Sequence, residues 1–138
     1  MQEGHDGGDS NTLYVMAAGA PAATTSLFEK AAGGQPVSER AFMQHLEAAK
    51  LIRAVIVTLK GGEEGKADLT WQDASAAFQM SGGGSPLGAP EYATAIALCG
   101  LVKYGGVPTL SSAQKVEGFL ANVSGSKDEH TVIGTPGH

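Results

Sequence analysis

The chain has a single cysteine, Cys99, among its 138 residues. An internal disulfide is therefore excluded. Cys99 lies in the mostly apolar run 95–102, which predicts a buried and inert thiol. The alternative is a catalytic nucleophile, but no histidine lies near Cys99 in the sequence to act as its base.

Positive charge is also scarce. The chain has nine Lys and Arg residues against 14 Asp and Glu, so its formal net charge is −5. The basic residues are scattered, whereas binding to phosphate groups needs them clustered. We expect no nucleic-acid partner.

Long apolar runs are missing as well. No stretch approaches the roughly 18 apolar residues that suggest a transmembrane helix, so we expect no membrane span. The mildly apolar segment 13–23 follows acidic residues and glycines, unlike the basic start of a signal peptide. We expect an intracellular and cytoplasmic protein, or one within a virion or cytoskeletal assembly.

Aromatic residues make up only 6% of the chain, and alanine supplies much of its 42% hydrophobic content. The length fits one domain. We expect a core of Leu, Val, Ile and Ala with six aromatic anchors: Phe28, Phe42, Trp71, Phe78, Tyr104 and Phe119.

Glycine, in contrast, is abundant, with 20 residues that mostly separate the apolar runs. The segment 81–89 is the clearest glycine-rich stretch, and it fits either a hinge or a surface loop. The predicted organisation is a flexible tail and apolar arm at 1–24, a first helical lobe at 25–80, this linker or loop at 81–89, a second helical lobe at 90–123, and a flexible tail at 124–138.

Five helical runs are predicted, at about Thr25–Ala32, Ser38–Lys60, Thr70–Met80, Pro90–Tyr104 and Ser111–Val123. In the second run, apolar residues three or four apart favour one continuous helix. Its segment 54–58 is rich in β-branched residues, which also suit a strand. The predicted fold class is therefore all-α with helix–loop–helix repeats, and the alternative is α+β if 54–58 is a strand.

Two of these helices have start signals of a specific kind. Thr70 with Asp73, and Ser111 with Gln114, have the spacing of a capping box. In this motif two side chains accept hydrogen bonds from N–H groups that the helix leaves unpaired.

A repeated pattern surrounds three helix starts. A helical run ends in a glycine-containing loop, one apolar residue follows, and a Ser or Thr cap begins a second helix that carries a Phe. The apolar residues are Val37, Leu69 and Leu110. Over about residues 25–123 this pattern resembles the EF-hand family of helix–loop–helix proteins.

The resemblance implies a pairing between neighbouring loops, with Val37 beside Leu69 and no clear partner for Leu110. Calcium loops need regularly spaced oxygen ligands. Here Lys30, Lys66 and Lys103 fall at ligand positions, where they would repel a cation. We therefore expect no tight calcium site, and no other metal or cofactor.

What the resemblance implies for function is a non-enzymatic, calcium-independent adaptor. Like the non-calcium hands of myosin light chains and calmodulin-like subunits, it would grip a partner's amphipathic helix in an apolar groove. The alternative for the candidate groove residues is that they form the core. These partner-binding candidates lie in the second lobe: Ala95, Ile96, Leu98, Leu101, Val116, Phe119 and Leu120.

Signals for catalysis are weak, and we expect no enzyme and no catalytic residues. His45 lies one residue off the apolar stripe, which predicts a boundary or surface position. The acidic residues Glu63, Glu64 and Asp68 predict a solvated loop, with a weak magnesium or calcium site as the alternative. The alternative function is a small structural subunit of a large virion, cytoskeletal or organellar assembly, whose tails dock on neighbouring subunits or on other copies.

Overall fold

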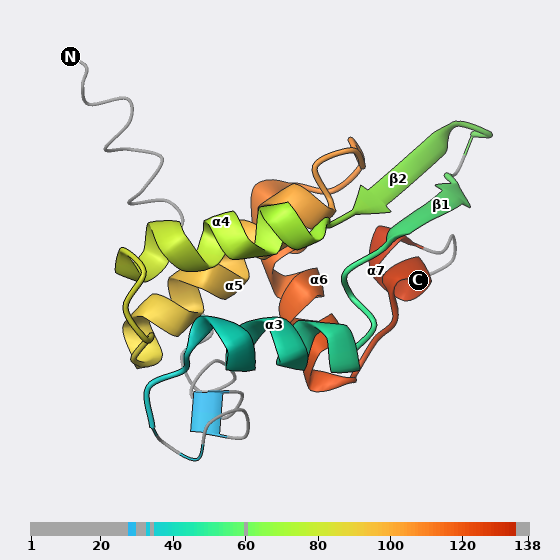
Figure 1. The fold of residues 1–138 in the computed structure, drawn as a ribbon. Helices are drawn as coiled ribbons and strands as arrows, with labels where there is room; N and C mark the ends of the chain where they lie inside the picture. The colour runs from blue at the N-terminus through green and yellow to red at the C-terminus, as the bar shows by residue number, and fades with distance from the viewer. Residues whose placement is uncertain (1–27, 30–32, 34, 60, 135–138) are drawn as a thin grey trace.

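The structure is a computed structural model that describes residues 28–29, 33, 35–59 and 61–134. Within these ranges the chain is largely helical, with one small two-stranded hairpin (Figure 1). The order of elements is α3 (Glu39–Ala48), β1 (Ala54–Thr58), β2 (Glu64–Asp68), α4 (Trp71–Gly82), α5 (Ala89–Lys103), α6 (Ser112–Ser124) and α7 (Glu129–Gly134).

The predicted helix over Ser38–Lys60 is wrong beyond residue 48, and the strand alternative for 54–58 is confirmed. The helix ends where Lys50 adopts a left-handed backbone with a φ of 60°. Beyond it, β-branched residues pair with β2, where they fit a pleated surface. Ile56, which the continuous helix would have buried, is 62% exposed.

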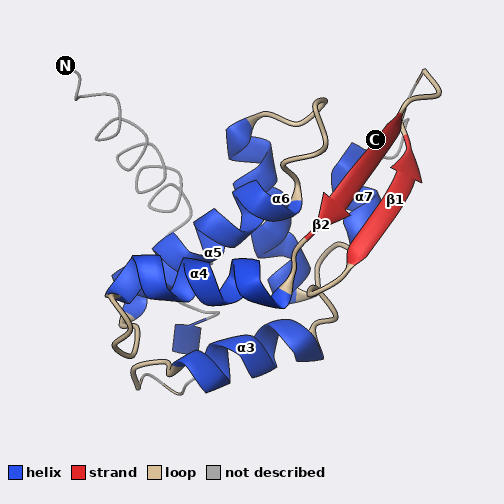
Figure 2. Ribbon diagram, turned by 45° about the horizontal axis from the view of Figure 1, so that its top comes forward, coloured by secondary structure: helices blue, strands red, loops and turns tan. Residues whose placement is uncertain are grey.

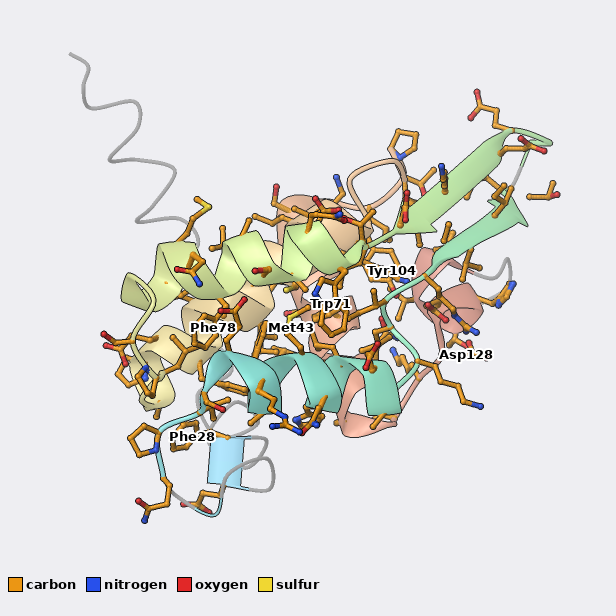
Figure 3. All side chains as sticks on the ribbon, viewed as in Figure 1. Phe28, Met43, Trp71, Phe78, Tyr104 and Asp128 are labelled. Atoms are coloured by element: carbon orange, nitrogen blue, oxygen red, sulfur yellow. The ribbon has the colours of Figure 1, made fainter. Side chains whose placement is uncertain are left out.

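The helices form the main body, and the hairpin projects from one end of it (Figures 1 and 2). Helix α5 packs against both α4 and α6, and α3 lies beside α4, while α7 packs against the hairpin. Rings meet in the core: the centroid of Phe42 is 5.9 Å from that of Phe78 and 6.2 Å from that of Tyr92. Among the six predicted anchors, Trp71 alone is exposed. Figure 3 shows its side chain between α3 and α4.

The last three predicted helices are confirmed as α4, α5 and α6, with ends close to those expected. Both capping boxes are present. The hydroxyl of Thr70 accepts from the N–H of Asp73, whose carboxylate accepts from the N–H of Thr70. Ser111 and Gln114 make the same two bonds. Local sequence alone fixes these helix starts.

The segment 81–89 contains a loop between α4 and α5, and its Leu87 is fully buried. Leu87 forms an antiparallel bridge with Val37, in which each N–H donates to the other carbonyl at 2.8 Å. The predicted pairing of Val37 with Leu69 is therefore wrong. Leu69 follows the hairpin instead, and its N–H donates to the carbonyl of Arg53.

The ends of the chain are described only in part. The predicted tail and arm at 1–24 lie outside the described residues. Of the predicted helix at 25–32, Phe28 and Glu29 are helical, and the Phe28 ring packs on Tyr92 with centroids 5.7 Å apart. The predicted flexible tail at 124–138 is wrong over residues 129–134, which form α7, while 135–138 lie outside the described ranges.

Candidate interaction groove

Most of the partner-binding residues predicted from the sequence lie in the core between α5 and α6. The two helices approach closely at Gly100, where an added Cβ would lie 2.9 Å from the Lys115 carbonyl oxygen and from the Phe119 Cβ. Leu98 and Leu101 are half-buried, and Ala95, Ile96, Val116, Phe119 and Leu120 are buried.

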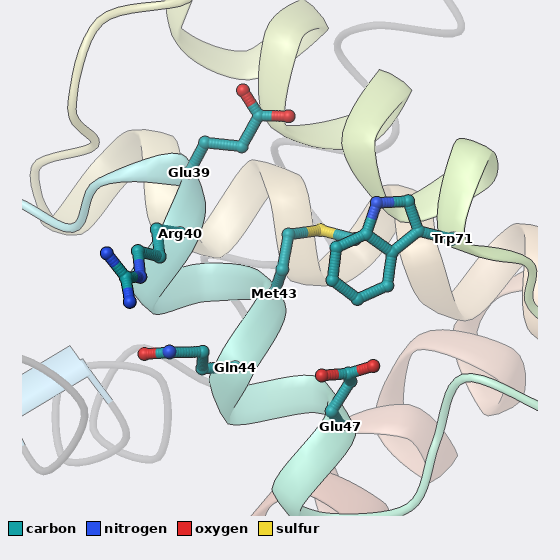
Figure 4. A pocket seen from close by; sticks show the side chains of 6 residues that line it. All are labelled: Glu39, Arg40, Met43, Gln44, Glu47 and Trp71. Carbon is teal, nitrogen blue, oxygen red and sulfur yellow. The ribbon is translucent and has the colours of Figure 1, made fainter.

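A groove does exist elsewhere, between α3 and the start of α4. Its volume is about 550 Å³ (Figure 4). Five of its lining side chains come from α3 and one from α4: Glu39, Arg40, Met43, Gln44, Glu47 and Trp71.

Two apolar side chains define the groove. Met43 faces inward from α3 and is 3% exposed, whereas Trp71, the first residue of α4, is 46% exposed. Figure 4 shows the thioether of Met43 and the indole of Trp71 directed toward one another. Sulfur–aromatic contacts of this kind are favourable and tolerate small adjustments of shape. The large, half-exposed indole of Trp71 thus packs over the buried side chain of Met43.

The groove also has an acidic edge. The Glu39 carboxylate accepts hydrogen bonds from the Ser75 hydroxyl at 2.6 Å and from the Gln79 amide at 2.9 Å, which ties α3 to α4. Glu47 is exposed near the Trp71 end of the groove, whereas Arg40 lies farther from Trp71 in Figure 4. The surface beside the indole is therefore apolar and negatively charged.

Sequence reasoning missed this groove because Trp71 was expected to anchor the core. A signal was present, since Trp71 directly follows the Thr70 cap. A residue in the first turn, next to its cap, lies at the end of a helix, where solvent is near. The placement of Trp71 over the buried Met43 depends on α3 folding back beside α4, which no local pattern encodes.

The sequence also offered Cys99, His45 and the acidic residues near the hairpin as candidates for catalysis or metal binding. Cys99 is fully buried, and burial raises the pKa of its thiol far above the usual range. His45 is half-buried on α3. Glu64 and Asp68 lie on β2, with Lys66 between them and 3.6 Å from the Asp68 carboxylate. Across the described ranges, no three His, Cys, Asp or Glu side chains are grouped to hold a metal ion.

A buried ionic cluster joins α7 to the body. The Lys103 ammonium donates to the carbonyls of Leu51 and Arg53, both at 2.9 Å, and lies 2.7 Å from the Glu129 carboxylate. The Arg53 guanidinium binds the same carboxylate. Burial lowers the pKa of Lys103, and the neighbouring Glu129 only partly offsets this. This cluster holds structure together, and its groups are already paired with one another.

None of the helices in the described part of the chain is both long and apolar enough to cross a membrane. No protein-family model matches the sequence, and no curated protein or solved structure matches it.

Proposed function

We propose that the chain is a non-enzymatic, calcium-independent interaction module that binds an amphipathic helix of a partner protein in the groove between α3 and α4. One observation carries this proposal: the half-exposed indole of Trp71 stands over the buried Met43 in a groove of about 550 Å³. Tryptophan is enriched among the residues that dominate binding energy at protein interfaces. Grooves with apolar floors are the usual receptors for amphipathic helices.

The acidic edge suggests the chemistry of the partner. Glu47 beside the indole, together with the net charge of −5, favours a helix with Lys or Arg flanking its apolar stripe. Charges at the rim of an interface mainly set orientation, selectivity and association rate, and contribute less to affinity. The apolar contact with Trp71 would supply the affinity, and Glu47 would select a basic partner.

The strand at 54–58 overturns the EF-hand repeat as the sequence placed it, because the second predicted unit forms the hairpin and α4 instead. An EF-hand-like pair of units remains part of the proposal, with its loops placed differently. The segments 33–37 (GGQPV) and 83–87 (GGSPL) share a sequence pattern, and each precedes a helix. Val37 and Leu87, the last residues of these segments, bridge to one another through two backbone hydrogen bonds. Such a contact between neighbouring loops is what the resemblance implies. The hairpin takes the place of the second predicted unit.

Calcium independence has its own support and its own test. Neither 33–37 nor 83–87 contains Asp or Glu, so both segments lack the carboxylates on which calcium loops depend. Trp71 is the chain's single tryptophan, and its fluorescence should stay unchanged as calcium is added. A saturable change at micromolar calcium would contradict this part of the proposal.

Site-specific photo-cross-linking tests the groove itself. A photoreactive residue would replace Gln44, which lines the groove, and a matched control would carry it at the exposed Glu117 on α6. Cross-linking in an extract of the source cells should join position 44 to one amphipathic, basic segment of a partner. Trp71→Ala should abolish that product while the chain stays folded. Identical products from positions 44 and 117 would contradict the proposal.

The second candidate function is a small structural subunit of a large assembly. One exposed strand favours it, because an uncharged strand edge can pair with another chain. Strand β1 carries no charge, and Ile56 at its centre is 62% exposed. A subunit would join several neighbours or copies of itself, so the mass of the native complex separates this function from the first.

A further inference from the structure

One strand edge of the hairpin forms no bridge to any other strand in the described part of the chain. Ile56 pairs with Lys66 across the hairpin, and Lys66 forms a bridge with Gly106 on its other side. The backbone groups of Lys66 therefore point away from β1, which makes Ile56 and Lys66 a non-hydrogen-bonded pair. It follows that the N–H and C=O of Ile56 point to the outer edge of β1. The described residues form no bridge there.

The two edges of the hairpin differ in their protection. On β2, the bridge to Gly106 covers the edge, and three charged side chains lie along the strand. Proteins commonly protect free edges in these ways, or with proline or a bulge. Strand β1 reads Ala-Val-Ile-Val-Thr and has no charge, proline or bulge. Its central residue, Ile56, is 62% exposed. The outer edge of β1 therefore lacks the features that usually stop an edge strand from pairing with another chain.

We propose that the outer edge of β1 pairs antiparallel with β1 of a second copy, on a two-fold axis at Ile56. The result is a symmetric dimer with a continuous four-stranded sheet. This inference does not depend on the groove at Trp71. In this register Ile56 faces its equivalent, and Ala54 faces Thr58 of the second copy. By symmetry, Thr58 also faces Ala54 of the second copy. In all three pairs the backbone N–H and C=O groups point toward the other copy, so each pair exchanges hydrogen bonds.

The lack of charge on β1 favours a second copy as the occupant. A two-fold axis at Ile56 places residues of the same strand opposite one another, so a charged strand would bring like charges together. Strand β1 carries no charge, and Arg53 before it is already bound to Glu129. Glu63 and Glu64 lie exposed at the turn of the hairpin, and antiparallel pairing keeps the turns of the two copies at opposite ends of the sheet. A second copy therefore fits this edge without like charges in contact.

The inner face of the hairpin leaves this pairing unobstructed. Its residues Val55, Gly65 and Ala67 are at least partly buried, and α7 packs against both strands. The outer face carries Ile56 and its neighbours. Pairing at the edge therefore adds strands beside the hairpin without displacing α7. The central contact is the Ile56 side chain against its own copy, supported by main-chain hydrogen bonds, as in other strand additions.

Disulfide trapping tests the register. Residues in a hydrogen-bonded antiparallel pair have Cα atoms about 5.5 Å apart, within the range that a disulfide spans. Ile56→Cys should give a covalent dimer rapidly under mild oxidation. Lys66→Cys lies on the same outer face one strand away, and Val102→Cys is similarly exposed on α5, so both should react slowly. Cys99 is fully buried and adds little background.

Analytical ultracentrifugation gives an independent test without new thiols. The unmodified chain should dimerise with increasing concentration. Ile56→Pro should stay monomeric, because it removes an outward N–H and leaves the hydrogen bonds of the hairpin intact. Val102→Lys, with circular dichroism as a check on folding, should still dimerise. Equal cross-linking of all three thiol variants, or a monomer at every concentration, would overturn the proposal. So would an Ile56→Cys thiol shielded from a small reagent in the monomer, which would mean that another part of the chain covers the edge.

Discussion

The ammonium of Lys103 and the carboxylate of Glu129 form a buried ion pair, 2.7 Å apart, with side chains that are 0% and 3% exposed. The pair joins the end of α5 to the start of α7. Removing charges from water is costly unless partners replace the water. Here Lys103 gains two carbonyls, and Glu129 gains Arg53 as a second partner. This cluster explains why the C-terminal segment forms a helix against the body instead of a free tail.

Removing one member of this pair should cost far more stability than removing both. Glu129→Leu leaves the Lys103 ammonium buried without its carboxylate, and should lower the free energy of unfolding by about 3 kcal/mol or more. The double variant with Lys103→Met should recover part of that loss. Urea denaturation of both variants measures this, with Glu117→Leu at an exposed position of α6 as the control. Equal losses in the single and double variants would show that the pair is not coupled.

The same cluster predicts how stability depends on pH. Burial alone would raise the pKa of Glu129, but its bonds to Arg53 and Lys103 outweigh burial, so its pKa lies below the usual value. The ionised form is therefore favoured by folding. This contribution is fully present above the unfolded-state pKa of about 4.3, and it is lost as the pH falls through the lower folded-state pKa.

Acid titration of stability checks this sign. The chain should lose unfolding free energy below about pH 4, and Glu129→Gln should show a shallower loss over the same range. Asp128 has a lowered pKa as well, through its bonds to Thr131, but both proteins retain it, so it cancels in the comparison. Parallel curves for the two proteins would mean that Glu129 does not contribute.

Close packing around α6 predicts that two glycines differ in how a substitution can be relieved. Gly100→Ala would place a methyl group 2.9 Å from a backbone oxygen of Lys115, which cannot move without shifting α6. We expect a loss of roughly 1–3 kcal/mol, even though alanine favours helix by up to about 1 kcal/mol. Gly118→Ala would overlap the stiff, β-branched side chain of Val132, so it should also destabilise, but Val132→Ala should relieve it. Thermal unfolding of both variants with and without Val132→Ala measures this, and equal relief at Gly100 and Gly118 would contradict this account.

Local sequence predicted much of the helical framework. The boxes at Thr70 and Ser111 fixed two helix starts, because a cap acts within a single turn. The segment 54–58 was ambiguous for a physical reason. Its apolar spacing also fits a helix, and only the tertiary pairing with β2 decides in favour of the strand.

The pairing of loops was predicted wrongly because the repeat was aligned on helix caps. The shared segments GGQPV and GGSPL would have matched Val37 with Leu87 instead of Leu69. The role of Lys103 was not predictable either. A lysine at the end of an apolar helix normally reaches solvent, and its burial here depends on Glu129, 26 positions along the chain, together with carbonyls from the segment before β1.

The groove between α3 and α4 was the least predictable feature from the sequence. The candidates on α5 and α6 are apolar at helical spacing, a pattern that core residues and groove residues share. What distinguishes Trp71 is its place at the start of α4 beside α3, and that depends on how two separate helices pack.

The most direct test of the central claim is the fluorescence of Trp71 during titration with a synthetic amphipathic helix of leucine and lysine. We expect a saturable blue shift, because the helix would exclude water from the indole. A matched helix of leucine and glutamate should bind weakly, and Glu47→Lys should weaken the response to the lysine helix while Glu117→Lys leaves it unchanged. An unchanged emission spectrum, or an equal response to both helices, would contradict the proposal that this groove receives a basic amphipathic helix.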